Sequence, residues 1–366
     1  MTGQHSQLAP SSAAIRMQCP GSRKMMEQFP QDESSPKALE GEMAHLVAMN
    51  MLNTGEIMPG ATEEMIEGAE MWCDAIRSLL FPVATYLTEN RVDCSTLHPV
   101  CFGTPDLWSY NSASNTLHVA DYKFGNRYVS EFENWQLLSY ASGIVAGMPV
   151  YDKSTLVVHL TIVQPRCYHR DGPVRTWSIN GRELEEYTVR LRENSHLAMT
   201  DDAPTITSPN CRDCTARHAC QTLQNAAYSI VDMQGDNVPF DLPAAAIGRE
   251  LATMREALGL LQARADGLEN EVLARVRQGQ SIPGWRTEQG VGREKWKVSI
   301  EEVVALGTMM GIDVGKHGVI TPKQAIKKGI SEEMVGMFTE VPTGEVKLVP
   351  DDGSKARRVF NKKQFL

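Results

Sequence analysis

The nine residues at 155–163, TLVVHLTIV, are almost all apolar or β-branched. Such a run suits a β-strand that is buried on both of its faces. The segment before it, 131–146, instead places apolar residues at helical spacing. A buried strand that follows a helix is typical of layered domains in which helices cover a sheet. We therefore predict an α/β core.

More helices and strands are expected upstream. Apolar residues recur at helical spacing in 36–52 and 63–80, so both segments are predicted to be helices. Strand-like runs follow at 83–91, 100–110 and 116–124. The turn-forming residues 111–115 separate the last two runs. The pattern predicts a meander of strands packed against helices.

The chain changes character after a further helix at 182–198. A stretch rich in proline and aspartate at 236–243 is the expected domain boundary, and an amphipathic helix at 245–278 follows it. The apolar side of that helix is expected to comprise Leu251, Met254, Leu258, Leu261, Leu268, Val272 and Val276. We predict one domain at 1–235 and a second at 244–366, in which a small α+β appendage follows the long helix.

Charge and composition narrow the classes of function. With a formal net charge of −9, the protein is not expected to coat nucleic acid by bulk electrostatics. Residues 241–366 hold 19 Lys and Arg against 17 Asp and Glu, whereas residues 1–240 hold 17 against 28. No apolar run is long enough to span a membrane, and MTGQHSQLAPSSAAIR lacks the apolar stretch of a secretory signal. We therefore expect a cytoplasmic protein in which any contact with nucleic acid has to be local.

The segment GTPDLWSYNSASNTLHVADYKFG brings two acids and a lysine onto strand-like runs. Asp106 is expected to end one strand, and Asp121 and Lys123 to lie on the next. Residues two apart on a strand share a face, so Asp121 and Lys123 should point the same way. Two carboxylates can bind Mg²⁺ or Mn²⁺, and a nearby lysine can orient water or offset charge in phosphodiester hydrolysis.

The acid-x-lysine pattern is not specific by itself. It recurs at 345–347 as Glu-Val-Lys, where a solvated strand is the expected interpretation. The first copy differs in its context, because an apolar strand surrounds the acid and the helix downstream carries Gln136 and Tyr140. Those two side chains are four residues apart and share a helical face. The combination favours one catalytic site.

These residues resemble the RecB-like branch of the PD-(D/E)xK nucleases, in which a histidine, an Asp, Asp-x-Lys and Gln-x-x-x-Tyr occur in this order. The matching residues are His45, Asp106, Asp121, Lys123, Gln136 and Tyr140. The resemblance implies a mixed central sheet flanked by helices. It also implies that His45, Asp106 and Asp121 bind the metal together with the Tyr122 carbonyl, that Lys123 assists the attacking water, and that Gln136 and Tyr140 position catalytic groups or phosphate. Glu89 offers a further carboxylate, although an exposed strand position is its simpler interpretation.

Four cysteines suit a second metal site. Cys211, Cys214 and Cys220 lie within ten residues in the polar stretch NCRDCTARHAC, and Cys19 can supply a fourth thiolate if the chain's beginning returns there. Four thiolates bind structural zinc or an iron–sulfur cluster. The other cysteines lie in apolar or strand-like contexts and are expected to be core residues: Cys73, Cys94, Cys101 and Cys167.

One cysteine before the nuclease motifs and three after them resembles the arrangement in iron–sulfur RecB-like nucleases. That resemblance favours a [4Fe-4S] cluster over Zn²⁺. A cluster held by Cys19 and Cys211 would close a loop of about 200 residues, and closing a long loop in this way constrains the unfolded chain strongly. We expect its role to be structural.

The whole chain resembles a family of phage and prophage proteins with this core and a similar appendage. The implied activity is that of a metal-dependent deoxyribonuclease, acting as an exonuclease on linear duplex or single-stranded DNA in phage recombination or replication, with a single-strand annealing protein as partner. An endonuclease or nickase on the same fold stays open, as does a non-catalytic DNA-binding module with a zinc staple. Basic residues that could contact DNA in the appendage are Lys323, Lys327, Lys328, Lys355, Arg357, Arg358, Lys362 and Lys363, although a solvated surface is their default interpretation. A monomer and a ring around DNA are both compatible with the sequence.

Overall fold

The computed structural model describes residues 6–29, 36–80, 85–148, 152–232, 244–285 and 333. The beginning of the 83–91 run, the 236–243 boundary and the appendage beyond 285 lie outside these residues. The Glu-Val-Lys copy at 345–347 and the basic residues from Lys323 onward also lie outside them. None of the described helices is long and apolar enough to cross a membrane.

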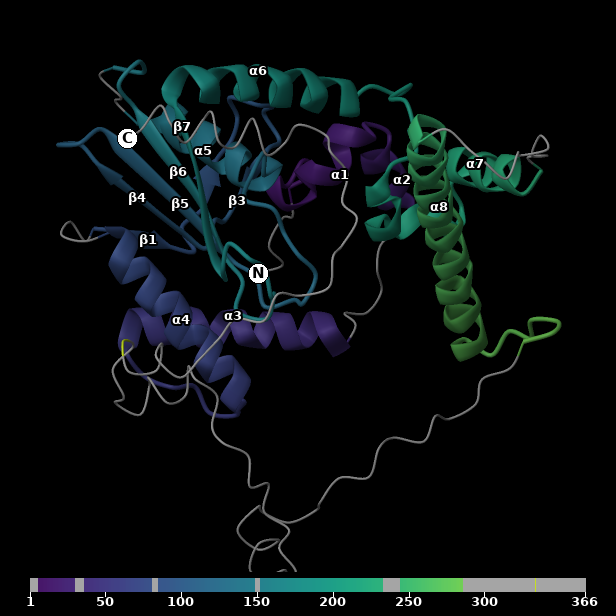
Figure 1. Cartoon of the computed structure of the whole chain (residues 1–366), viewed down its shortest axis with the longest axis horizontal. Helices are drawn as coiled ribbons and strands as arrows, with labels where there is room; N and C mark the ends of the chain where they lie inside the picture. Colours follow the sequence, from purple (N-terminus) through teal and green to yellow (C-terminus); the bar gives the residue numbers. More distant parts are fainter. Residues whose placement is uncertain are drawn as a thin grey trace, which may run out of the picture. The chain divides into compact units, whose positions relative to one another are not determined.

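A five-stranded mixed sheet forms the centre of the molecule (Figure 1). Its strand order is β1-β4-β5-β6-β7, and the bounds are Leu87–Thr88, Leu107–Asn111, Thr116–Tyr122, Val157–Val163 and Val174–Asn180. Only β5 and β6 are parallel, and the helix α5 (Trp135–Gly147) connects them. β2 (Val92–Asp93) and β3 (Phe102–Gly103) form a separate antiparallel pair. The protein is therefore a mixed α/β protein.

Helices cover both faces of this sheet (Figure 1). On one face, α5 and α6 (Gly181–Ala198) contribute to a core that includes Leu117, Val119 and Leu160. On the other face, α3 (Pro36–Thr54) and α4 (Glu63–Leu80) pack over Ala120 and Tyr122. Gly68 of α4 permits this approach, because a Cβ atom there would lie 2.5 Å from the Tyr122 hydroxyl. The predicted helices at 36–52, 63–80 and 182–198 and the buried strand at 155–163 are confirmed.

Several predicted boundaries are wrong. Among the described residues of the 83–91 run, strand geometry is confined to Leu87–Thr88, and the next residue, Glu89, has a positive φ of 45°. Asp106 precedes β4 instead of ending a strand. The helix expected from 131 starts at Trp135, because Glu133 has a positive φ of 49° and the Asn134 side chain caps the helix by accepting the Leu137 N–H.

The remaining helices surround the cysteine-rich segment. α1 (Ala13–Gln18) and α2 (Ser22–Gln28) approach it from the N-terminal side. The short 3₁₀ helices η1 (Pro10–Ser12), η2 (Pro209–Asp213) and η3 (Thr215–His218), together with α7 (Gln221–Asp232) and α8 (Ala244–Arg277), complete the described elements. α8 packs against η2, η3 and α7.

The apolar side predicted for the long helix is wrong in part. Leu258 is 65% exposed, and Met254 and Leu268 are also exposed. The buried face is instead formed by Ala257, Leu260 and Ala263. Small side chains let the helix approach the 3₁₀ turns closely, so the largest apolar residues do not mark the contact.

Candidate active site and cysteine pocket

The predicted acid–lysine centre lies where β4 begins and β5 ends. β4 and β5 pair antiparallel, with Leu107 opposite Ala120, so Asp106 reaches the end of β5. One Asp106 carboxylate oxygen accepts the Tyr122 N–H at 2.7 Å. Its other oxygen lies 2.9 Å from Nε2 of His45, which projects from α3. The pairing of β4 with β5 and the packing of α3 thus bring together residues that are far apart in the sequence.

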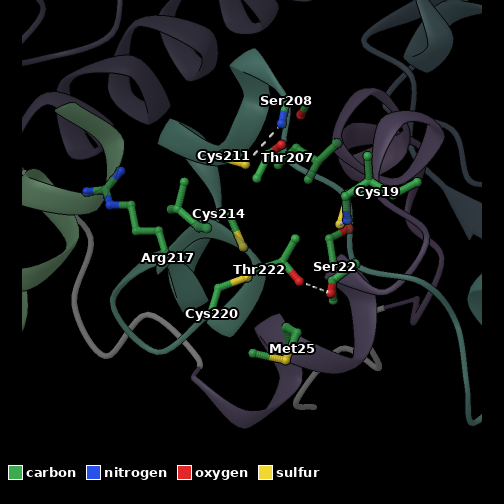
Figure 2. A pocket seen from close by; sticks show the side chains of 14 residues that line it. Cys19, Ser22, Met25, Thr207, Ser208, Cys211, Cys214, Arg217, Cys220 and Thr222 are labelled. Carbon is green, nitrogen blue, oxygen red and sulfur yellow. Dashed lines mark hydrogen bonds between the residues drawn. The ribbon is translucent and has the colours of Figure 1, made fainter. Parts of the chain in front are cut away.

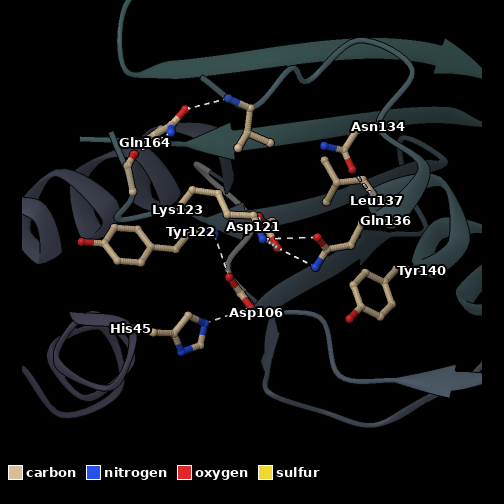
Figure 3. A network of polar contacts seen from close by, with 12 residues as sticks. His45, Asp106, Asp121, Tyr122, Lys123, Asn134, Gln136, Leu137, Tyr140 and Gln164 are labelled. Carbon is tan, nitrogen blue, oxygen red and sulfur yellow. Dashed lines mark hydrogen bonds and ion pairs between the residues drawn. The ribbon is translucent and has the colours of Figure 1, made fainter. Parts of the chain in front are cut away.

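The carboxylate of Asp121 is the centre of the second half of this network (Figure 3). Lys123 Nζ lies 3.1 Å from Asp121 Oδ1 and 2.9 Å from Oδ2, and Gln136 Nε2 donates to Oδ1 at 3.0 Å. The Gln136 carbonyl oxygen accepts from Lys123 Nζ at 3.2 Å. Acid, lysine and amide therefore form a closed triangle of hydrogen bonds.

Tyr140 lies one turn beyond Gln136 on α5. Its hydroxyl donates to the Thr104 carbonyl at 3.1 Å. Burial, followed by the charges of Asp121 and Asp106, raises the pKa of Tyr140 above its usual range. The side chain is therefore a neutral donor held beside the two carboxylates, without a direct hydrogen bond to Asp121 or Lys123 in the structure.

Burial strongly affects the ionisation of this centre. It raises the pKa of Asp121 to about 6, against the opposing effect of Lys123. For Lys123, burial alone would lower the pKa, but the charges of Asp121 and Asp106 raise it above the ordinary value. His45 behaves similarly: burial lowers its pKa, and the hydrogen bond and charge of Asp106 more than reverse this effect. Perturbed titratable groups in one place are typical of functional sites.

Glu89 lies closer to this centre than its sequence context indicates. Its Oε1 is 3.6 Å from His45 Nδ1, and its N–H donates to the Asp106 carbonyl at 3.2 Å. The residue is exposed as expected, but it lies in a bend with positive φ and not in a strand, so the strand part of the interpretation is wrong. A non-glycine residue in this conformation carries backbone strain, which is often found at functional sites.

The donor atoms suit a hard divalent cation. Carboxylate and carbonyl oxygens with one imidazole are ligands that Mg²⁺ and Mn²⁺ accept. The Oδ2 atom of Asp121 is buried, and the Lys123 ammonium lies 2.9 Å from it, so a cation at this carboxylate would share the oxygen with Lys123 or displace it. No three His, Cys, Asp or Glu side chains within the described ranges are gathered around one point as a bound ion requires. In this structure Lys123 pairs with the Asp121 carboxylate, and His45 pairs with the Asp106 carboxylate.

A buried amide, Gln164, fixes the loop that follows Lys123. It donates to the carbonyls of Gly125 and Arg127 at 2.7 and 2.6 Å and accepts from the Val129 N–H and from Arg175 Nη2 at 3.1 and 2.9 Å. Arg175 also donates to the Val129 carbonyl and lies 3.3 Å from Glu131. Neither Gln164 nor Arg175 was expected as a site residue. The hydrogen-bond partners of these two residues are distant in the sequence, so no short sequence motif indicates the network.

Replacing Gln164 with leucine is expected to destabilise the protein by about 2 kcal/mol, because buried donors and acceptors lose their partners. Urea unfolding should show a lower midpoint with an unchanged slope. Gln221→Leu is the matched control, since Gln221 is exposed on α7 and bonds only Asn225. That control should change stability by less than about 0.5 kcal/mol. Equal midpoints for the two variants would contradict a structural role for Gln164.

The four predicted metal-binding cysteines line one pocket (Figure 2). Cys19 follows α1, Cys211 lies in η2, Cys214 separates η2 from η3, and Cys220 precedes α7. Gly21 joins the two parts of the chain: its N–H donates to the Pro204 carbonyl, and a Cβ there would lie 2.6 Å from the Ala203 oxygen. The return of the N-terminal segment to the cysteine-rich segment is thus built into the fold.

The pocket provides backbone N–H groups to sulfur. The Ile206 N–H donates to Cys19 Sγ and the Ser208 N–H to Cys211 Sγ, both at 3.3 Å. Burial, followed by the charges of the other cysteines, raises the pKa of Cys214 to about 11. Burial likewise raises the pKa of Cys19. Both shifts favour the neutral thiol over the thiolate, and a bound metal would reverse this preference. The other four cysteines are buried away from the pocket, which confirms them as core residues.

The fold and these two places define a mixed α/β protein with a buried acid–lysine centre and a four-thiol pocket. The chain belongs to the family described as Protein of unknown function (DUF2800), whose model matches residues 5–356.

Proposed function

We propose that this protein is a metal-dependent deoxyribonuclease of the PD-(D/E)xK type, in the RecB-like branch. One observation carries the proposal: the buried carboxylate of Asp121 is bonded to both Lys123 and Gln136, while Asp106 is fixed beside it by the Tyr122 N–H. A structural ion pair does not require a second, histidine-bonded acid and an amide clamp at the same strand end. Metal-assisted phosphodiester hydrolysis uses such groups together, because acids bind the cation while a lysine orients water or offsets charge.

Each residue has a distinct role in this proposal. Asp106, Asp121 and the Tyr122 carbonyl would bind Mg²⁺ or Mn²⁺, with His45 as a nitrogen ligand. The cation, when bound, polarises the phosphate and lowers the pKa of a water molecule. Lys123 is oriented by the Asp121 carboxylate and the Gln136 carbonyl, so its charge can face the water or the developing negative charge. Tyr140 is placed to donate to a phosphate oxygen after releasing Thr104.

The cysteine pocket is proposed to hold a [4Fe-4S] cluster. A cluster bonds four thiolates at separated corners, whereas a zinc ion needs all four sulfurs at about 2.3 Å from one point. The four sulfurs line one pocket, and the preference for the cluster is supported by the resemblance of one cysteine before and three after the motifs to iron–sulfur RecB-like nucleases. Its ligands come from both ends of the core, so its role is structural.

An end-processing exonuclease is the subclass that we propose, acting in phage recombination or replication beside a single-strand annealing protein. The support for this subclass is the resemblance of the motif set, because the geometry of the centre is common to exonucleases, endonucleases and nickases. The choice among them depends on the substrate.

The proposal predicts that anaerobically purified protein degrades end-labelled linear DNA with Mg²⁺ or Mn²⁺ and not in EDTA. Metal removal eliminates the Lewis acid and the activated water, so the rate should fall to background. Closed circular DNA of the same sequence is the matched substrate. Its survival would support an exonuclease, and its nicking or linearisation would support an endonuclease or nickase.

Absence of cleavage on every substrate by folded, cluster-loaded protein would overturn the nuclease proposal. A non-catalytic DNA-binding module would then be the better description of the fold. Stoichiometric zinc in a colourless protein would overturn the cluster and leave the nuclease proposal untouched.

A further inference from the structure

The turn between β6 and β7 carries aromatic side chains on the protein surface. Tyr168 is 103% exposed, so its whole ring is open to solvent. The neighbouring His169 ring stacks on Tyr128 with a centroid distance of 4.6 Å and an interplanar angle of 23°. We call Tyr128, Tyr168 and His169 the stacking platform. An aromatic ring that is fully exposed buries no apolar surface and adds nothing to folding by the hydrophobic effect.

The stacking platform is rigid at its base. The Arg175 guanidinium lies 4.9 Å from the centroid of the Tyr128 ring, and its side chain is only 1% exposed. Gln164 binds the loop of Tyr128 to the end of β6 through three hydrogen bonds, and a fourth comes from Arg175 on β7. A ligand that stacks here therefore meets a preorganised surface, which lowers the entropic cost of binding.

The platform is carried by the loop after Lys123 and the turn after Val163, which begin at the end of the sheet where the acid–lysine centre lies. The Lys123 N–H donates to the Val163 carbonyl at 2.9 Å, and Gln164 follows directly in the chain. Figure 3 shows Gln164 on the same side of the sheet end as Lys123 and Asp121. Since β5 and β6 are parallel, the loop after Lys123 and the turn after Val163 leave the sheet at the same edge.

The charges beside the platform are balanced. Arg127 is paired with Asp213 at 2.7 Å, and Arg170 lies 3.6 Å from Asp171. Arg166 contacts Glu40 and Glu64, both at 3.0 Å. A surface with paired charges attracts a duplex backbone weakly, because phosphate binding depends on uncompensated cations. Aromatic rings bind any base with an open π-face, so the platform suits unpaired bases better than duplex DNA.

We propose that the stacking platform binds unpaired nucleobases of a DNA strand next to the acid–lysine centre. The direction of the strand toward Asp121 and Lys123 rests on the proposed nuclease function, whereas the binding itself does not. The substrate class is accordingly a single-stranded end or a frayed duplex end. Tyr168 is the principal contact, since its ring is wholly accessible.

Fluorescence anisotropy with a labelled oligothymidylate tests this proposal on the full chain in EDTA, where hydrolysis is prevented. Tyr168→Ala should weaken binding about five- to hundredfold, in line with the loss of one stacked base. Tyr168→Trp should retain binding, because the ring is kept. Tyr228→Ala is the control, since Tyr228 is a 58% exposed tyrosine on α7. An abasic strand of the same charge should bind the original protein and Tyr168→Ala with the same affinity.

The outcomes separate this proposal from the nuclease proposal. Three outcomes would overturn the proposed base binding. Tyr168→Ala could bind oligothymidylate with the same affinity as the original protein, or it could lose as much affinity for the abasic strand as for oligothymidylate. The third outcome is that the original protein binds no oligothymidylate at all. A changed oligomeric state of Tyr168→Ala in light scattering, with unchanged DNA affinity, would instead assign Tyr168 to contact between copies of the chain. Binding that depends on Tyr168, without cleavage in Mg²⁺, would uphold the platform and overturn the nuclease.

Discussion

Asp121→Asn is expected to reduce metal-dependent DNA hydrolysis by about three orders of magnitude or more while leaving the protein folded. The substitution keeps the volume of a side chain that is 2% exposed, and it can still bond Gln136. It removes the negative charge that would bind the cation, and that cation supplies several kcal/mol of transition-state stabilisation. Initial rates on end-labelled linear DNA, with circular dichroism of each preparation, measure both effects.

Lys123→Ala should give a loss of about two to three orders of magnitude on the same substrate, because one preorganised charge is removed from the centre. The matched control is Lys153→Ala. Lys153 is a 62% exposed lysine that forms an ion pair with Glu185 on α6, so activity should be unchanged. If Asp121→Asn and Lys123→Ala both cut DNA at the original rate, the catalytic centre lies elsewhere in the chain.

The fold was most predictable where one element has one simple periodicity. Helix α4 follows from its amphipathic apolar spacing, and β6 follows from its run of β-branched residues. β7 has strict alternation of buried and partly buried positions, yet one buried position is Arg175, which hides the strand in a hydrophobicity pattern. The face of α8 was misjudged for the opposite reason, since Ala257 and Ala263 form its contact together with Leu260, while Met254, Leu258 and Leu268 stay exposed.

The candidate site was predictable to the extent that its geometry is local. Asp121 and Lys123 are two residues apart on one strand, and Gln136 and Tyr140 are four apart on one helix. The contact of Asp106 with the Tyr122 N–H depends on strand register, and the approach of Glu89 to His45 depends on a positive φ. No spacing of residue types along the sequence indicates either of these two contacts. Long-range pairing therefore has to be seen in the structure.

The combined substitution of Cys211 and Cys214 by serine is expected to remove bound iron and to destabilise the core by about 5 kcal/mol, as estimated from the entropy of closing so long a loop. A loss of that size is comparable with the whole stability of many domains. The N-terminal segment would then be held mainly by contacts such as the bond from Gly21 to Pro204. Thermal unfolding, iron content and the visible absorption of anaerobic protein measure the result.

Cys167→Ser is the control for this experiment, because Cys167 is buried but lies outside the pocket. It should retain iron and lose only about 1 kcal/mol, the usual size of a small change in a core. An unchanged unfolding temperature in the double variant would contradict the structural role of the cysteines. Retained nuclease activity at low temperature, together with a lowered unfolding temperature, is the expected pattern, since the thiols stabilise the core and the acid–lysine centre performs the chemistry.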